Sequence, residues 1–384
     1  MRFLFFCAQY LPTVGGVERY TYNLCKTLSE MGHSSTIVTS QLEGLAELEN
    51  SENISIVRLP SYMLLNGRFP LLKRNSSFKS LMNEVFSSDY DMAIINTRFY
   101  PLSLYGAKQC HRRGISAIVI EHGSSHLSLG NHLVNVFVRI YEHLAIGVVK
   151  RYCKDFYGVS ISCQKWLEHF RVKSHGVIYN AIDPEAINET AKSSALDIRE
   201  KLCLTDEAVV VFSGRFLKEK GIYELLDAFK MLAADNSNAV LVMAGNGPLF
   251  QEVESKKPPN VHLVNQLSFM DSLALLKQAD IFILPTYSEG FSTVTLEAAA
   301  LGKCIISTPT GGNPELIQHM HSGMLLETVS PKSILSALQY ALNDEAFRDE
   351  LGCRVQQIVQ EKFNWKSSAN KLLMIAGQMG NQRT

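Results

Sequence analysis

Residues 208–234 read AVVVFSGRFLKEKGIYELLDAFKMLAA. The first half is an apolar, β-branched run, which is typical of a strand buried on both faces of a parallel sheet. In the second half, Ile222, Leu225, Leu226 and Phe229 recur at helical spacing. The stretch therefore predicts a strand, a short loop and a helix, the unit from which parallel α/β sheets are built.

The same alternation continues along the chain on both sides of this unit. The polar stretch 180–202 divides it into two series, and 384 residues suffice for two domains. We therefore expect an α/β protein whose domains are linked within 180–202. The other candidate strands are 3–8, 35–40, 54–59, 91–96, 115–121, 239–245, 261–265, 280–285, 303–308 and 323–327.

The charge is zero overall, with 37 Lys+Arg and 37 Asp+Glu, but it is distributed unevenly. Residues 1–180 contain 19 basic and 13 acidic side chains, so the remainder contains 18 and 24. The basic first half suits an anionic partner. The eight cysteines include no CxxC pair, and no segment has the length of a signal peptide core or a membrane span. We expect a cytoplasmic protein that does not bind nucleic acid.

The turns after the strands contain the candidate site residues, because ligands of open α/β sheets bind beyond the carboxyl ends of the strands. Arg215 and Lys220 share one short loop, and a planar guanidinium beside a mobile ammonium suits two phosphates. The alternative is a solvated basic turn. Gly15-Gly16 precedes a helix and allows close approach to an anion, although a glycine pair also makes ordinary turns.

Three further turns are less specific. Gly245-Asn246-Gly247-Pro248 lacks the third glycine of a dinucleotide fingerprint, which argues against a nicotinamide enzyme. His122 ends a strand, and a lone histidine there is more often structural than catalytic. His122 and His126 have helical metal spacing without a third ligand nearby in the sequence, so we predict no metal. The turn Thr310–Leu316 has Asn313 as the expected N-cap of a helix.

Glu289 and Glu297 flank a loop-to-helix junction. If the whole stretch were helical, they would lie about 12 Å apart along the axis, farther than the roughly 5–9.5 Å of glycosidase pairs. We expect the helix to begin near Phe291 or Ser292, so that the two carboxylates contact different parts of one long ligand. Backbone N–H groups near Gly290 then face a phosphate at the helix N-terminus.

Taken in order, Gly15-Gly16, Gly214-Arg215 with Lys220, Gly245–Pro248 and Glu289 followed by Glu297 resemble the motif set of family 4 retaining glycosyltransferases. The resemblance covers nearly the whole chain. It implies a GT-B fold, with two Rossmann-like domains whose parallel sheets face each other across a central cleft. Residues 1–179 would bind the acceptor and residues 180–362 the nucleotide-sugar. A final helix within 363–384 would cross back to the first domain.

By this resemblance, Arg215 and Lys220 would hold the pyrophosphate, Glu297 the ribose and Glu289 the sugar hydroxyls, with His122 near the reaction centre. A UDP-sugar is favoured over a GDP-sugar as the donor, and transfer with retention would need no metal or other cofactor. Further donor contacts would come from Gly15, Gly16, Gly214, Asn246, Gly247, Gly290, Phe291 and Ser292.

Basic and apolar residues are mixed in two parts of the first half that contain no acidic residue, 53–83 and 92–120. Such mixtures suit an anionic membrane surface, and an ordinary solvated face is the alternative. We expect peripheral attachment to the inner face of the cytoplasmic membrane, and a saccharide or lipid-linked acceptor in cell-surface polysaccharide or lipopolysaccharide synthesis. Two other functions remain open, a non-catalytic nucleotide-sugar-binding scaffold and a sugar-nucleotide epimerase of the same fold. The basic residues in question are Arg58, Arg68, Lys73, Arg74, Lys79, Arg98, Lys108, Arg112 and Arg113.

Overall fold

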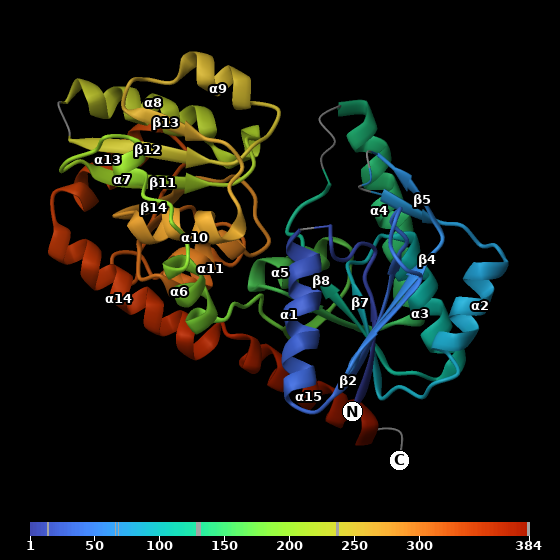
Figure 1. The fold of residues 1–384 in the computed structure, drawn as a ribbon. Helices are drawn as coiled ribbons and strands as arrows, with labels where there is room; N and C mark the ends of the chain where they lie inside the picture. The colour runs from blue at the N-terminus through green and yellow to red at the C-terminus, as the bar shows by residue number, and fades with distance from the viewer. Residues whose placement is uncertain (14, 66, 68, 128–131, 236–237, 382–384) are drawn as a thin grey trace. The chain divides into compact units, whose positions relative to one another are not determined.

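Two units make up the chain in the computed structural model, which describes residues 1–13, 15–65, 67, 69–127, 132–235 and 238–381 (Figure 1). The N-terminal unit contains residues 1–180 together with the C-terminal helix, which begins at Trp365. The C-terminal unit spans Ala181–Asn364. Each unit contains its own parallel sheet with helices packed on it, which is the Rossmann-like arrangement.

The sheet of the N-terminal unit has the strand order β10-β9-β8-β7-β1-β2-β4-β3. Its neighbouring strands are parallel except for the edge strand β3, which pairs antiparallel with β4. The strands are β1 (Arg2–Phe6), β2 (Ser34–Ser40), β3 (Leu48–Ser51), β4 (Ile54–Leu59), β7 (Met92–Asn96), β8 (Ala117–Glu121), β9 (Asp155–Gly158) and β10 (Ser174–Val177). A separate hairpin consists of β5 (Ser61–Leu64) and β6 (Phe69–Leu72).

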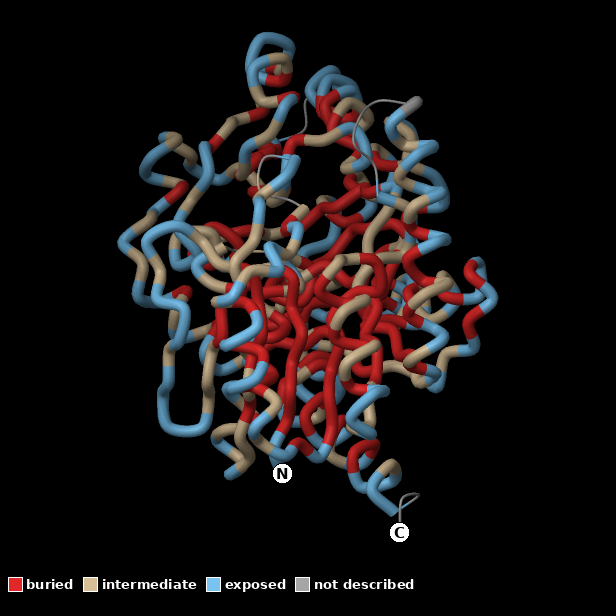
Figure 2. The backbone as a smooth tube through the Cα atoms, turned by 90° about the vertical axis from the view of Figure 1, so that its right-hand side faces the viewer, coloured by how far each residue is buried: buried red, intermediate tan, exposed pale blue. Residues whose placement is uncertain are grey.

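Buried residues of this unit concentrate in the central strands, which appear as red segments in Figure 2. Phe3–Phe6 of β1 and Met92–Ile95 of β7 have no exposed surface, because helices cover both faces of the sheet. The helices of the unit are α1 (Gly16–Glu30), α2 (Ser76–Val85), α3 (Pro101–Arg113), α4 (His132–Tyr152), α5 (Ile161–His169) and α15 (Trp365–Asn381).

The sheet of the C-terminal unit is parallel throughout, with the order β13-β12-β11-β14-β15-β16. Its strands are β11 (Ala208–Ser213), β12 (Ala239–Ala244), β13 (Val261–Val264), β14 (Ile281–Leu284), β15 (Cys304–Ser307) and β16 (Met324–Leu325). The helices are α6 (Pro184–Lys192), α7 (Ile198–Lys201), α8 (Ile222–Ala234), α9 (Phe250–Lys256), α10 (Phe269–Gln278), α11 (Thr293–Ala300), α12 (Asn313–Leu316), α13 (Pro331–Leu342) and α14 (Glu345–Lys362), with a 3-10 turn at Lys218–Lys220.

Every strand expected from the sequence is present, although most are one or two residues shorter than the apolar run. Five short strands, β3, β5, β6, β9 and β10, were not expected. β3 reads LENS and has no apolar pattern, so only its pairing with β4 makes it a strand. The polar stretch 180–202, expected to hold the domain link, forms α6 and α7 of the C-terminal unit.

Helix α15 packs on α1 within the N-terminal unit. The ring of Trp365 meets Tyr20 edge to face at a centroid distance of 5.5 Å, and Ser368 Oγ donates a hydrogen bond of 2.8 Å to the carbonyl of Tyr179. Among the described residues, no helix is both long and apolar enough to cross a membrane.

Candidate active site

The chemically interesting turns of the C-terminal unit lie at one edge of its sheet. Strands β12, β11, β14 and β15 are consecutive neighbours and parallel, so the loops that follow them are neighbours as well. These loops contain Asn246 and Gly247, then Arg215 and Lys220, then Glu289 to Ser292, then Thr308 to Asn313. The sheet therefore brings together motifs that are spread over about a hundred residues of sequence.

The loop after β11 is fixed against the end of β14 by Gly221. This glycine has φ +67°, in the left-handed region, and a Cβ atom on it would lie 2.1 Å from the carbonyl oxygen of Pro285. Only glycine fits both the conformation and the space. The close approach places Lys220, one residue earlier, beside the loop that contains Glu289.

Lys220 and Glu289 form an ion pair between Nζ and Oε1. Both side chains are largely buried, with exposed fractions of 16% and 19%, so the pair is shielded from solvent more than a surface salt bridge. Arg215, on the same loop as Lys220, is exposed. The edge of the sheet thus presents an accessible guanidinium and an ammonium that is held by a carboxylate.

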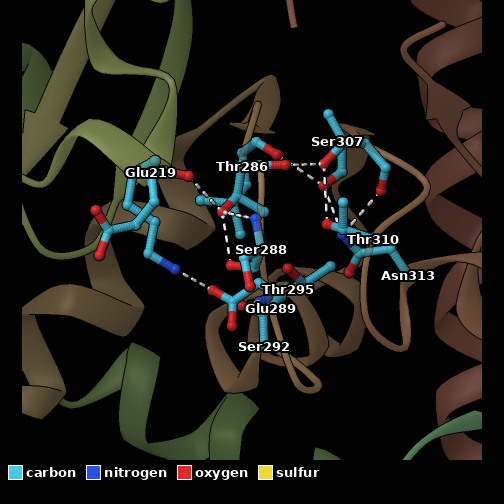
Figure 3. Close-up of polar contacts among 12 residues, drawn as sticks. Glu219, Thr286, Ser288, Glu289, Ser292, Thr295, Ser307, Thr310 and Asn313 are labelled. Atoms are coloured by element: carbon cyan, nitrogen blue, oxygen red, sulfur yellow. Dashed lines mark hydrogen bonds and ion pairs between the residues drawn. The ribbon is translucent and has the colours of Figure 1, made fainter. Parts of the chain in front are cut away.

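Backbone and hydroxyl contacts hold the loop between β14 and α11 in place. Thr286 Oγ1 lies 3.0 Å from the carbonyl oxygens of both Glu219 and Ser288, and the N–H of Tyr287 donates to the Glu219 carbonyl at 2.8 Å. Figure 3 shows Thr286 between Glu219 and Ser288, with Glu289 beyond them. Thr308 Oγ1 donates to the carbonyl of Thr286 at 2.6 Å. The carboxylate of Glu289 is therefore mounted on a rigid loop.

Helix α11 begins where the sequence suggested. Ser292 is its N-cap, and the Ser292 hydroxyl accepts a hydrogen bond of 3.2 Å from the N–H of Thr295. Both residues lie near Glu289 in Figure 3. Glu297, one turn into the helix, is 3% exposed, and Phe291 packs against Phe363 at 5.1 Å between ring centroids. Glu289 thus precedes the helix and Glu297 lies within it.

The loop after β12 packs directly on the loop after β11. The N–H of Phe216 donates to the carbonyl of Asn246 at 3.0 Å, and a Cβ on Gly245 would lie 2.0 Å from the Gly214 carbonyl oxygen. Asn246 itself is exposed, and its Oδ1 accepts from the N–H of Gly247 at 2.7 Å. Gly214, Asn246 and Gly247 therefore belong to one packed double loop beside Arg215.

The expectation that Asn313 caps α12 is wrong, because Gly312 is the N-cap and Asn313 is the first helical residue. Asn313 is fully buried, and its Nδ2 donates to Ser307 Oγ at 2.8 Å and to the Thr308 carbonyl at 3.1 Å. Figure 3 shows this amide beside Ser307 and Thr310. Its role is to support the loop after β15.

In the N-terminal unit, His122 is oriented by a chain of polar groups. His122 Nε2 lies 2.9 Å from Asn96 Oδ1, and Asn96 Nδ2 donates to Thr21 Oγ1 at 2.9 Å. Since the amide nitrogen faces Thr21, Asn96 offers an acceptor to the imidazole, and Nε2 carries the proton. The Tyr20 ring meets the imidazole edge to face at 4.8 Å. Loss of solvation lowers the pKa of His122 to about 3, so the ring is neutral at pH 7.

Gly15 and Gly16 open helix α1, with Gly15 as the N-cap in an extended conformation. A Cβ on Gly15 would lie 2.3 Å from Oε2 of Glu18, whereas no described atom lies within 4 Å of a Cβ on Gly16. Glu18 is 8% exposed, and burial raises the pKa of its carboxyl group. Glu18 and Asn96 were not among the site residues expected from the sequence. The signal for Asn96 is a polar residue at the carboxyl end of a buried strand.

Two of the basic residues assigned to the anionic surface are buried instead. Arg58 is 3% exposed and pairs with Glu49 at 2.6 Å. Arg98 is 1% exposed and lies between Glu121 and Glu142, at 2.5 and 3.1 Å. Arg68 lies outside the described residues. The remaining basic side chains, Lys73, Arg74, Lys79, Lys108, Arg112 and Arg113, are exposed or half-buried.

Models of two glycosyltransferase families match the chain, one after the other along the sequence. A model of Glycosyltransferase Family 4 matches residues 14–186, and a model of Glycosyl transferases group 1 matches residues 195–357. The chain belongs to glycosyltransferase family 4. The second model contains all four loops at the edge of the C-terminal sheet, and the first contains Gly15, Gly16 and His122.

Relatives of this glycosyltransferase span its full length. An uncharacterized glycosyltransferase of Methanocaldococcus jannaschii is 24% identical over 99% of both chains. The phosphatidylinositol N-acetylglucosaminyltransferase GPI3 subunit of Saccharomyces cerevisiae is 22% identical over 96% of this chain and 81% of its own. The structure of Anabaena HepE in complex with UDP-glucose aligns with a TM-score of 0.71 at 16% identity, over 98% of this chain and 100% of that one. The glycosyltransferase therefore has the GT-B fold.

Proposed function

We propose that this glycosyltransferase moves a hexosyl group, with retention at the anomeric carbon, from a nucleotide-sugar to a saccharide or lipid-linked acceptor. The observation that carries the proposal is the packing of Arg215, Lys220, Glu289 and the start of α11 at one sheet edge. Arg215 and Lys220 are cations that can pair with a diphosphate leaving group, and the Glu289 carboxylate can accept hydrogen bonds from sugar hydroxyls.

The charges of these side chains suggest how the donor binds. Arg215 and Lys220 hold the pyrophosphate, since a guanidinium and an ammonium both pair with phosphate oxygens. The backbone N–H groups from Gly290 to Ser292, at the positive end of α11, add to this stabilisation. Glu289 accepts hydrogen bonds from the sugar hydroxyls on one side of the phosphates, and Glu297 accepts hydrogen bonds from the ribose hydroxyls on the other side. A UDP-sugar is the preferred donor, because HepE, which has the same fold, was solved with UDP-glucose.

Cleavage of the sugar–phosphate bond places negative charge on the departing diphosphate and positive charge on the anomeric carbon. Arg215 and Lys220 stabilise the diphosphate electrostatically, which replaces a metal ion in this role. Neutral His122, held by Asn96, presents its Nδ1 lone pair at the reaction centre without adding positive charge there. No described atom lies within 4 Å of a Cβ built on Gly16, so no packing contact explains a glycine at this position. Its lack of a side chain allows the backbone of α1 to approach the donor.

The acceptor is bound by the N-terminal unit at a membrane surface. Helix α4 exposes Phe137, Ile140 and Leu144 by 72%, 53% and 67%. The β5–β6 hairpin adds exposed apolar residues, and its Phe69 meets Tyr141 of α4 at 5.6 Å between ring centroids. Exposed basic residues accompany both elements. An amphipathic surface of this kind suits anionic lipid, and one relative is named for a lipid acceptor, phosphatidylinositol. The pathway that fits is synthesis of cell-surface polysaccharide or lipopolysaccharide.

The direct test incubates the purified protein with UDP-, GDP- and ADP-sugars, with and without lipid-linked saccharides. We expect consumption of a UDP-sugar that depends on the acceptor, and a product whose anomeric proton coupling matches that of the donor. Binding of the nucleotide-sugar without turnover would identify a scaffold. Interconversion of donor sugars without an acceptor would identify an epimerase. Either result would reject the transferase proposal.

A further inference from the structure

Three histidines from separate segments meet on the N-terminal unit, and none of them is among the residues assigned to the donor. His126 lies in the loop after β8, His143 on α4, and His169 is the last residue of α5. One ring nitrogen from each lies within 4.8 Å of the other two. From the sequence alone His126 was paired with His122 and had no third ligand nearby, because its partners in the fold are 17 and 43 positions away in the chain.

We propose that His126, His143 and His169 bind one divalent transition-metal ion of the zinc class. Imidazole nitrogen suits Zn²⁺, Ni²⁺ and Cu²⁺. In a tetrahedral site with Zn–N distances near 2.0–2.1 Å, ligand nitrogens lie about 3.4 Å apart. The Nε2 atoms of His126 and His169 are already 3.2 Å apart. His143 is exposed, so rotation of its side chain brings the third nitrogen into place.

The hydrogen bonding of His126 prepares it as a ligand. Its Nδ1 lies 2.6 Å from Oε2 of Glu142, which is fully buried. A carboxylate in this position holds the proton on Nδ1, points the Nε2 lone pair at the metal and makes it more basic. Glu142 is itself fixed, because its Oε1 accepts from the N–H of Leu127 at 3.0 Å and its Oε2 accepts from Arg98 at 3.1 Å.

The local charge balance also favours a cation. Arg98, Glu121 and Glu142 are each at most 1% exposed and, when ionised, carry one positive and two negative charges. A positive charge at His126 compensates the remaining negative charge. Three protonated imidazoles at these distances would repel one another.

The surroundings leave one coordination position open. His169 stacks on Trp166, with ring planes 4° apart at 4.7 Å, which fixes the plane of the imidazole. A hollow of about 340 Å³ lies beside His143 and His169, and Lys150 and Arg171 line it. These two cations favour an anion, such as hydroxide or a carboxylate, as the fourth ligand. The ion would tie the loop after β8 to α4 and α5, and that loop begins with His122.

The test titrates metal-free protein, purified without a polyhistidine tag, with Zn²⁺ in a competition assay against a chromophoric chelator. We expect one saturable equivalent per chain, and an affinity at least about tenfold lower in His143→Ala and in His169→Ala. Co²⁺ bound to the wild type should show the visible absorption of a nitrogen-ligated, four- or five-coordinate ion. Zn²⁺ should raise the melting temperature of the wild type and not that of the two variants.

The matched control is His175→Ala, which removes another exposed histidine of the same unit, outside the cluster. It should bind Zn²⁺ as the wild type does. Absence of saturable binding would overturn the proposal. So would wild-type affinity in either cluster variant, or an equal loss in His175→Ala, because each shows that the three imidazoles do not act as one site. None of these readouts depends on transferase activity.

Discussion

Lys220 and Glu289 are joined in an ion pair although 68 residues separate them in the sequence. The pair forms because Gly221 lets the loop after β11 approach the end of β14, where the loop containing Glu289 begins. The same ammonium is assigned to the diphosphate and the same carboxylate to the sugar. Binding of the donor therefore acts on two side chains that already hold each other in position.

Substitutions of Lys220 and of Glu289 should weaken the binding of different parts of the donor. Lys220→Met should weaken binding of UDP and of UDP-sugar alike, by about tenfold or more, because an ionic hydrogen bond contributes about 1.5–3 kcal/mol. Glu289→Gln should leave UDP affinity within about twofold and weaken only the UDP-sugar, because the carboxylate contacts the sugar. Calorimetric titration with both ligands measures this. Lys218→Met, an exposed lysine of the same loop, is the control. Equal losses for both ligands in Glu289→Gln would contradict the assignment.

Gly221 should be essential to the stability of the C-terminal unit. Gly221→Ala forces a left-handed conformation on alanine and a clash with the Pro285 carbonyl, so we expect unfolding to become easier by at least about 2 kcal/mol. Gly377→Ala, in the exposed part of α15, meets no described atom within 4 Å. It should be neutral or stabilising by up to about 1 kcal/mol. Urea denaturation followed by circular dichroism compares the two. Similar midpoints for both variants would refute the steric argument.

His122 should make the protein more sensitive to acid. Its pKa is about 3 in the folded protein and about 6.5 when unfolded, so the unfolded chain binds the extra proton below pH 6.5. Folding stability should then fall by up to about 1.4 kcal/mol per pH unit between pH 6.5 and about 3. His122→Gln removes this contribution, so its stability should decline less steeply than that of the wild type. Parallel declines, or an NMR titration of His122 near pH 6.5, would contradict the burial argument.

The apolar face of α4 should determine membrane attachment. Phe137→Ser combined with Leu144→Ser should reduce sedimentation with anionic vesicles by at least about tenfold, since burying one such side chain contributes about 1.5–3 kcal/mol. High salt should weaken the attachment of the wild type to the vesicles, because it screens the basic side chains from the anionic lipid. Met374→Ser, a comparable exposed apolar residue on α15, should behave as the wild type does. Unchanged sedimentation of the double variant would reject this surface while leaving the transferase proposal intact.

Much of the fold was predictable from the sequence because its strands are nearly continuous apolar runs between amphipathic helices. Residues 208–213 and 222–234 have a strong local pattern, and the structure follows it. The short strands β9 and β10 lack such a pattern. β9 is a strand because β8 offers it a partner edge, and β10 is a strand because β9 does the same. That the loops after these strands share one edge of the sheet followed from parallel topology.

What the sequence could not provide was the direction and partner of individual side chains. Arg58 and Arg98 count as basic residues in a sequence, yet both are buried in ion pairs that form through tertiary contacts. Asn96, which orients His122, is separated from it by 26 positions. His126 meets its partners only because α4 and the end of α5 reach the loop after β8. Each of these contacts depends on segments that are distant in the chain.

Arg215 and Lys220 are the residues that we propose stabilise the departing diphosphate of a nucleotide-sugar. The most direct measurement is the rate of nucleotide release from a UDP-sugar, with acceptor, by the wild type, Arg215→Ala and Lys220→Ala. We predict a loss of about 10²–10³-fold in kcat/KM for each variant, as is typical when one group that stabilises transition-state charge is removed from an enzyme. Release at the wild-type rate in either variant would contradict the claim.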